Sequence, residues 1–240
     1  MSRPAKLGRG AEQPSPARTI VLAGLVLTAV ALCVQTAGHL LNEIAFDGRY
    51  ASLNAGADGS AFDWASSSVA FAAAGAAALR AACFVERRMV YASLAAVLGF
   101  LSLDDVVGLH DKIERAPGAW SAAAFAVILG AAVVLLVIVS RETPKPALGP
   151  LVAGLGLLVV ATAARLVAAG VGLETYRDWS TAQRALGVVL VQDADLGGWS
   201  LVAVGLAAAL CTSLVAVRGI SEELPVGTNG RDLVAAGSRR

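Results

Sequence analysis

The chain has 240 residues, of which 57% are hydrophobic and 15% are charged, and its mean hydropathy is +0.69. These values exclude a disordered chain and do not suit an ordinary soluble domain. The formal net charge of +1 argues against an extended nucleic-acid-binding surface. Because the apolar residues come in long blocks that neither alternate nor leave one polar face, we expect a lipid bilayer around the chain.

The apolar blocks are long enough for membrane-spanning helices, each of which needs about 20 residues to cross a ~30 Å hydrocarbon core. In chain order the expected spans are Thr19–Leu41, Ala61–Phe84, Met89–His110, Trp120–Ser140, Leu148–Gly170 and a sixth that ends near Val217. The last apolar block, Ala185–Val217, is longer than one upright crossing. Either this helix projects beyond the membrane or its first turns lie at the interface.

The predicted fold is therefore all-α: a polytopic bundle of six transmembrane helices at 19–217, between flexible polar tails at 1–18 and 218–240. If the N-terminus is cytoplasmic, most Lys and Arg residues fall on the cytoplasmic side, as the positive-inside rule requires. Six spans then place the C-terminus in the cytoplasm too. The alanine-rich, arginine-over-lysine composition is typical of a high-GC bacterium, so we expect the bacterial plasma (inner) membrane.

The most informative stretch is the outer end of the third expected span, where Asp104 and Asp105 lie within the hydrocarbon. A charged side chain at the centre of a spanning helix costs about 2.5–3.5 kcal/mol on insertion scales. We therefore expect both acids to face inward and to carry a ligand or a proton. His110 and Asp111 follow at the end of the same span, where they would control access.

Other expected spans carry polar residues at a similar depth. In chain order these are Gln35, His39, Asn42, Glu43, the run Ser66–Ser68, Arg165, Asp193 and Asp195. Arg165 either balances the charge of the acids or snorkels to the outer surface. Asp193 and Asp195 point in roughly opposite directions on a helix, so at most one of them faces the bundle centre. The serine run either belongs to the site or starts a helix by satisfying its backbone N–H groups.

Three kinds of binding fit these groups, and their spacing does not choose among them. A divalent metal such as zinc could be held by His39, His110 and Asp104. Adjacent carboxylates repel each other, which favours the binding of a proton. A small polar solute or a cation could bind at the outer leaflet. The three cysteines lie singly in apolar blocks and suggest no metal or redox site.

The segment from Phe100 to Asp111 resembles the FLSxD(D/E)xxxxH(D/E) signature of a group of small bacterial multi-spanning membrane proteins. The similarity extends to Asp47, to the serine run and to the acidic start of the last span. The resemblance implies a membrane-helix bundle and no particular activity. The site residues that it implies are Asp104, Asp105, His110 and Asp111, with Asp193 and Asp195 less securely aligned.

A more distant and partial similarity is to the alkaline ceramidases and adiponectin receptors, multi-spanning zinc hydrolases whose motif contains a serine, an aspartate and three histidines. Ser66–Ser68, Asp104 or Asp105, and His110 could correspond to part of that motif. The C-terminal HxxxH of those hydrolases is absent, and the chain has only two histidines and six expected spans where seven are needed. One chain therefore cannot build a three-histidine zinc site.

The predicted function is the binding or transport of a small ion, a proton or a polar solute at an outward-facing site. One alternative is a metal-dependent intramembrane lipid hydrolase with a metal-bound water as nucleophile. Another is a structural or partner-binding membrane protein whose polar groups hold helices together. The sequence contains no P-loop, nucleophile elbow or inverted repeat, which weakens the case for any specific enzyme or carrier.

Overall fold

The computed structural model describes residues 15–55, 59–107, 120–171 and 180–223. These ranges contain α-helices, one short 3-10 helix and no β-strand, so the prediction of an all-α fold is confirmed for them. The elements are α1 (Pro16–Ala45), η1 (Ala51–Leu53), α2 (Ala61–Cys83), α3 (Arg88–Val107), α5 (Trp120–Ser140), α6 (Lys145–Val171) and α8 (Thr181–Glu223).

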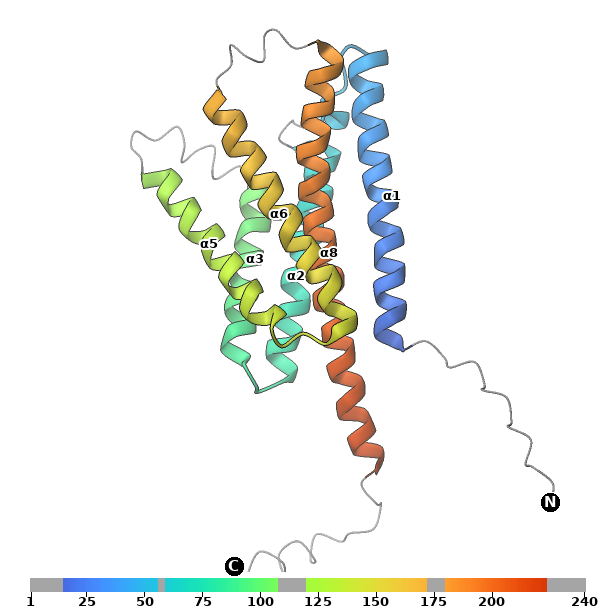
Figure 1. The fold of residues 1–240 in the computed structure, drawn as a ribbon, viewed down its shortest axis with the longest axis vertical. Helices are drawn as coiled ribbons and strands as arrows, with labels where there is room; N and C mark the ends of the chain where they lie inside the picture. The colour runs from blue at the N-terminus through green and yellow to red at the C-terminus, as the bar shows by residue number, and fades with distance from the viewer. Residues whose placement is uncertain (1–14, 56–58, 108–119, 172–179, 224–240) are drawn as a thin grey trace, which may run out of the picture.

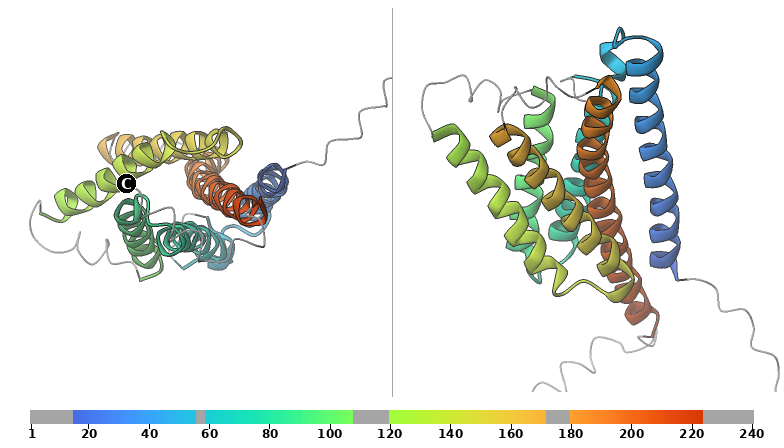
Figure 2. Two further views of the ribbon diagram at one scale, coloured as in Figure 1. Left: turned by 90° about the horizontal axis from the view of Figure 1, so that it is seen from below. Right: turned by 45° about the horizontal axis from the view of Figure 1, so that its top comes forward.

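The helices alternate in direction along the chain, as Figure 1 shows. We call the end of the bundle where α1 begins and α8 finishes the basal end, and the opposite end the apical end. The α2–α3 and α5–α6 turns lie at the basal end, and η1 lies at the apical end. Figure 2 shows α8 between α6 and α2, with α1 beside it and α5 on the outside of the bundle.

On α1, large apolar side chains are exposed and polar side chains are buried. Leu27, Val26 and Ile44 are 69%, 63% and 65% exposed, whereas Gln35 and His39 are buried. This pattern is the reverse of a soluble helix and fits an outer surface that contacts lipid. Four described helical segments are long and apolar enough to cross a membrane: Pro16–Ala45, Ala61–Cys83, Lys145–Ala164 and Thr181–Arg218. Spans at α3 and α5, and the cytoplasmic placement of both termini, stay predictions.

The helix starts explain why some boundaries differ from the expected spans. Ser15 accepts a hydrogen bond from the Arg18 N–H ahead of Pro16, so α1 begins three residues before the expected span. Ser60 caps α2 through the Asp63 N–H. The run Ser66–Ser68 lies inside α2 and is not the helix start.

Helix α8 is longer than expected at both ends. The Ser180 hydroxyl accepts the Gln183 N–H, and the Gln183 side chain accepts the Ser180 N–H, so the two residues form a capping box that starts the helix at Thr181. At ~1.5 Å per residue its 43 residues extend about 65 Å, twice the hydrocarbon thickness. Figure 1 shows its last turns beyond the basal ends of the other helices. Residues 218–223 of the expected flexible tail are therefore helical.

Candidate functional site

A pair of hydrogen bonds joins α1 to α8 in the apical half of the bundle. The Asp193 carboxylate accepts one from Gln35 Nε2 at 2.8 Å and one from Thr36 Oγ1 at 2.5 Å. Gln35 is 1% exposed, and Asp193 is partly buried. Hydrogen bonds to a charged acceptor are short and strong, so Asp193 holds the two helices in a fixed register. Of the two acids at the start of the expected last span, Asp193 thus bonds to α1.

His39 lies one turn above this link and is 2% exposed. Its Nδ1 accepts a hydrogen bond from the backbone N–H of Ala55, at 3.0 Å. Because Nδ1 accepts, a neutral ring carries its proton on Nε2, and that atom is buried with no hydrogen-bond partner among the described residues. His39 therefore offers a buried donor.

Asn42 fixes the chain that leaves α1. Its side-chain Oδ1 accepts the Tyr50 N–H at 2.9 Å, and its backbone carbonyl accepts the N–H groups of Phe46 and Gly48. Asp47 and Gly48 have positive φ angles, which turn the chain back over α1. Asn42 is fully buried, and its Nδ2 is a second donor that finds no partner in the described ranges.

The neighbouring helices α2 and α3 contribute hydroxyl and carboxyl groups. The Ser102 hydroxyl donates to the Ser67 carbonyl at 2.8 Å, which joins the apical parts of the two helices. Ser66 Oγ is buried and has no partner among the described residues. Asp104 is 5% exposed and takes part in a polar or electrostatic interaction, so it lies inside the bundle.

The remaining predicted site residues are placed less completely. Asp195 is half-buried in α8 and also takes part in a polar or electrostatic interaction. Asp105 belongs to α3 and Arg165 to α6, but their side chains lie outside the described part of the structure. His110 and Asp111 lie outside the described residues altogether. The roles assigned to all these residues stay predictions.

The metal site suggested by the sequence needs His39, His110 and Asp104 together. Within the described ranges, no group of three or more His, Cys, Asp or Glu side chains could hold a metal ion. A metal-bound imidazole must also present a lone pair, and usually donates its other N–H to an acceptor. His39 has the reverse arrangement, because its Nδ1 faces an N–H donor. This geometry suits a hydrogen-bond donor better than a ligand.

Two polar contacts were not anticipated from the sequence. Thr36 follows Gln35 and lies one turn before His39, so helical periodicity alone could have placed it on the polar face. Ser102 lies two residues before Asp104 and could have been read as a link between helices, since serine often bonds across membrane helices.

The position of the His39 proton can be measured directly. In a His110→Asn variant, His39 is the only histidine, so ¹⁵N NMR of the imidazole reports on this ring alone. We expect a neutral ring with a protonated Nε2 and an unprotonated Nδ1, because the Ala55 N–H is directed at Nδ1. A protonated Nδ1 on a neutral ring would contradict this assignment and restore His39 as a candidate metal ligand.

Comparisons of this chain with protein-family models, with curated protein sequences and with solved structures give no match.

Proposed function

We propose that this chain is a six-span integral membrane protein of the bacterial plasma membrane, with its basal end in the cytoplasm. Support comes from the alternating helices, from the apolar outer surface of α1 and from the four long apolar segments. The basal end also carries most of the described basic residues: Arg18, Arg80, Arg87, Arg88, Arg141, Lys145 and Arg218. The positive-inside rule places such an end on the cytoplasmic side.

Within this protein, the polar groups at the apical ends of α1 and α8 bind and release a proton. The observation that carries this proposal is the buried imidazole of His39, one helical turn from Gln35 and Thr36, whose side chains bond to the Asp193 carboxylate that links α1 to α8. Binding and release of a proton require only titratable groups that lie near each other. Asp104 is a further carboxyl group buried in the same half of the bundle. Ionisable side chains inside membrane bundles commonly form such relays.

Protonation of Asp193 would change the contact between the helices. A neutral carboxyl group has one O–H donor in place of an acceptor. Gln35 Nε2 can still donate to the remaining carbonyl oxygen, but the Thr36 hydroxyl must turn from donor to acceptor. The strong charge-assisted bonds become ordinary ones, which weakens the α1–α8 link. A proton taken up here is thereby coupled to the position of α1, as transport requires.

Infrared difference spectra of the protein in lipid, recorded between acidic and neutral buffer, test this proposal. We expect a band from a buried protonated carboxyl group that disappears in Asp193→Asn. Asp47→Asn is the matched control, because Asp47 is exposed and asparagine tolerates its positive φ. A wild-type spectrum with no such band, or one unchanged in Asp193→Asn, would refute proton binding at this residue.

A purely structural role is the second candidate, and the same two hydrogen bonds favour it. Gln35 and Thr36 satisfy the Asp193 carboxylate without any ligand, and polar side chains are a common link between membrane helices. Under this alternative the infrared band is absent, and only the stability of the bundle depends on the three residues. The metal-dependent hydrolase has less support, because the Nδ1 atom of His39 is taken by the Ala55 N–H.

A further inference from the structure

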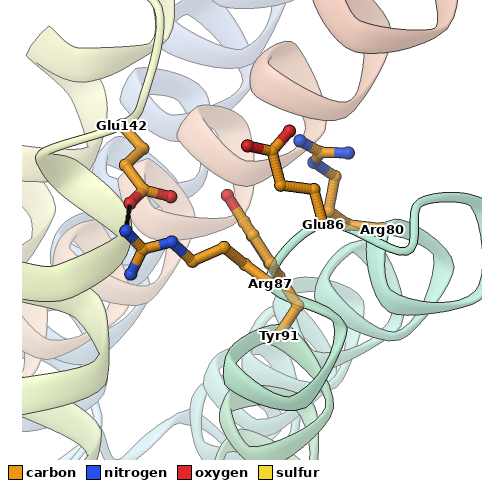
Figure 3. Close-up of a pocket in the computed structure, with 5 residues that line it drawn as sticks. All are labelled: Arg80, Glu86, Arg87, Tyr91 and Glu142. Atoms are coloured by element: carbon orange, nitrogen blue, oxygen red, sulfur yellow. Dashed lines mark ion pairs between the residues drawn. The ribbon is translucent and has the colours of Figure 1, made fainter.

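A cavity of about 320 Å³ opens at the basal end of the bundle, far from the apical polar groups. It is lined by residues of the α2–α3 and α5–α6 turns: Arg80, Glu86, Arg87, Tyr91 and Glu142. Its volume is at the lower end of the ~300–1,000 Å³ typical of small-molecule sites. Figure 3 shows Arg87 and Glu142 on one side, Arg80 and Glu86 on the other, and the Tyr91 hydroxyl between them.

The charges on the first side of the cavity are already matched. Arg87 and Glu142 form an ion pair that joins the two basal turns. Their side chains are 49% and 35% exposed, so the pair contributes little to stability by itself. It does close one wall of the cavity and leaves no net charge there.

Arg80, on the second side, is held in place but is not neutralised. Its guanidinium lies over the Phe84 ring at 4.0 Å and over the Tyr91 ring at 5.2 Å. These cation–π contacts fix the plane of the group and leave its N–H donors for another partner. The NH1 atom is buried and has no hydrogen-bond partner within the described structure. A fixed guanidinium with an unused buried donor is suited to an oxyanion such as phosphate.

Glu86 supplies the opposite charge beside it. It forms no ion pair with any described residue, and Figure 3 shows its carboxylate on the same side of the cavity as the Arg80 guanidinium. The cavity thus presents a guanidinium and a carboxylate side by side, and neither forms an ion pair with a described residue. The Glu86 carboxylate would repel a ligand with a single negative charge at Arg80, whereas a zwitterion can contact both groups favourably.

We propose that this cavity binds a phosphoethanolamine zwitterion, with its phosphate on Arg80 and its ammonium group on Glu86. The surroundings favour a lipid headgroup as the source, because Val85 and Met89 beside the cavity are 88% and 76% exposed. Pockets of basic residues between helices at the cytoplasmic surface are recognised headgroup sites. The inference rests on the membrane placement proposed above but not on the proton site, which lies at the other end of the bundle.

Native mass spectrometry of the full chain, released from mixed micelles of phosphatidylethanolamine and phosphatidylglycerol, tests the proposal. We expect wild-type protein to retain phosphatidylethanolamine about tenfold better than phosphatidylglycerol, the effect of one charge-assisted hydrogen bond. Arg80→Met should lower retention of both lipids. Glu86→Gln, which alters no ring contact and so leaves folding intact, should remove the preference. Arg88→Gln, a neighbouring exposed arginine outside the cavity, is the matched control.

Equal retention of the two lipids by wild-type protein, or an unchanged preference in Glu86→Gln, would overturn the proposal. So would an Arg88→Gln variant that loses as much lipid as Arg80→Met. Soluble phosphoethanolamine, added to protein in lipid-free detergent, distinguishes the sources of the ligand. Retention of the soluble zwitterion through Arg80 and Glu86 would assign the site to a free molecule. If it is not retained while the lipid is, the lipid headgroup is the ligand. Absence of the infrared band would refute proton binding at the apical end and would leave the lipid-binding result at the basal end unchanged.

Discussion

Substitution of Gly154 by alanine is expected to destabilise the bundle by about 1–3 kcal/mol, the usual cost of overpacking a close contact. Gly154 lies where α6 crosses α8, and a Cβ atom there would lie 2.7 Å from the Gly198 carbonyl oxygen and 2.8 Å from the Val202 nitrogen. Both atoms belong to the backbone of α8, so neither can move aside as a side-chain tip can. The two helices would have to separate along their whole contact.

Gly156→Ala is the matched control for this substitution. Gly156 is in the same helix two residues away, and a Cβ atom there would meet nothing within 4 Å. We expect it to be neutral or to stabilise α6 by up to ~1 kcal/mol, because alanine is the better helix former. Unfolding by SDS in mixed micelles, followed by circular dichroism, measures both variants. Equal stabilities would show that α6 and α8 do not cross at Gly154.

The order of the helices could be predicted from the sequence because long apolar blocks, of the length that membrane helices need, mark their positions. The polar face of α1 could also be predicted from the sequence, because Gln35, His39 and Asn42 recur at helical spacing. The inward placement of Asp104 followed from the cost of a charge in hydrocarbon. Each of these features depends on one helix and its solvent, and local sequence contains that information.

Features that depend on packing between helices could not be predicted from the sequence. Asp193 and Asp195 are equally acidic, and the sequence does not say which of them faces α1. The rotation of α8 decides this, and that rotation is set by close contacts such as the one between Gly154 and Gly198. The bond from Ala55 to His39 likewise requires the chain after α1 to fold back, which depends on the turn at Asp47 and Gly48.

The two ends of the bundle are built on different physical principles. At the apical end, buried groups such as Gln35 and Asp193 satisfy each other across helices, so any exchange of a proton alters helix contacts. At the basal end, Arg80 and Glu86 form no ion pair with a described residue, so the ligand proposed there would bind without breaking an ion pair between helices. Under the two proposals, a proton bound at the apical end alters contacts between helices, whereas a ligand bound at the basal end does not.

The strength of the α1–α8 link decides between coupling and a purely structural role. In a double-mutant cycle of Gln35→Leu and Asp193→Leu, we expect a coupling energy of about 1.5 kcal/mol, near the upper end of values for polar contacts in membrane bundles. Gln35→Leu leaves Asp193 with only the Thr36 bond, and Asp193→Leu leaves the Gln35 amide without this acceptor, whereas the double substitution removes both ends of the Gln35–Asp193 bond. The double variant should therefore be more stable than the sum of the single losses predicts.

Gln192 provides the control for this cycle, because it precedes Asp193 in α8 and is also half-buried. Gln35→Leu combined with Gln192→Leu should be additive within about 0.5 kcal/mol. If the Gln35–Asp193 pair is additive as well, the two side chains do not bond in the membrane, and α1 is held to α8 by packing alone. If coupling is found and the infrared band of Asp193 is absent, the link is structural. Coupling together with the band means that the carboxyl group which holds α1 to α8 also takes up the proton.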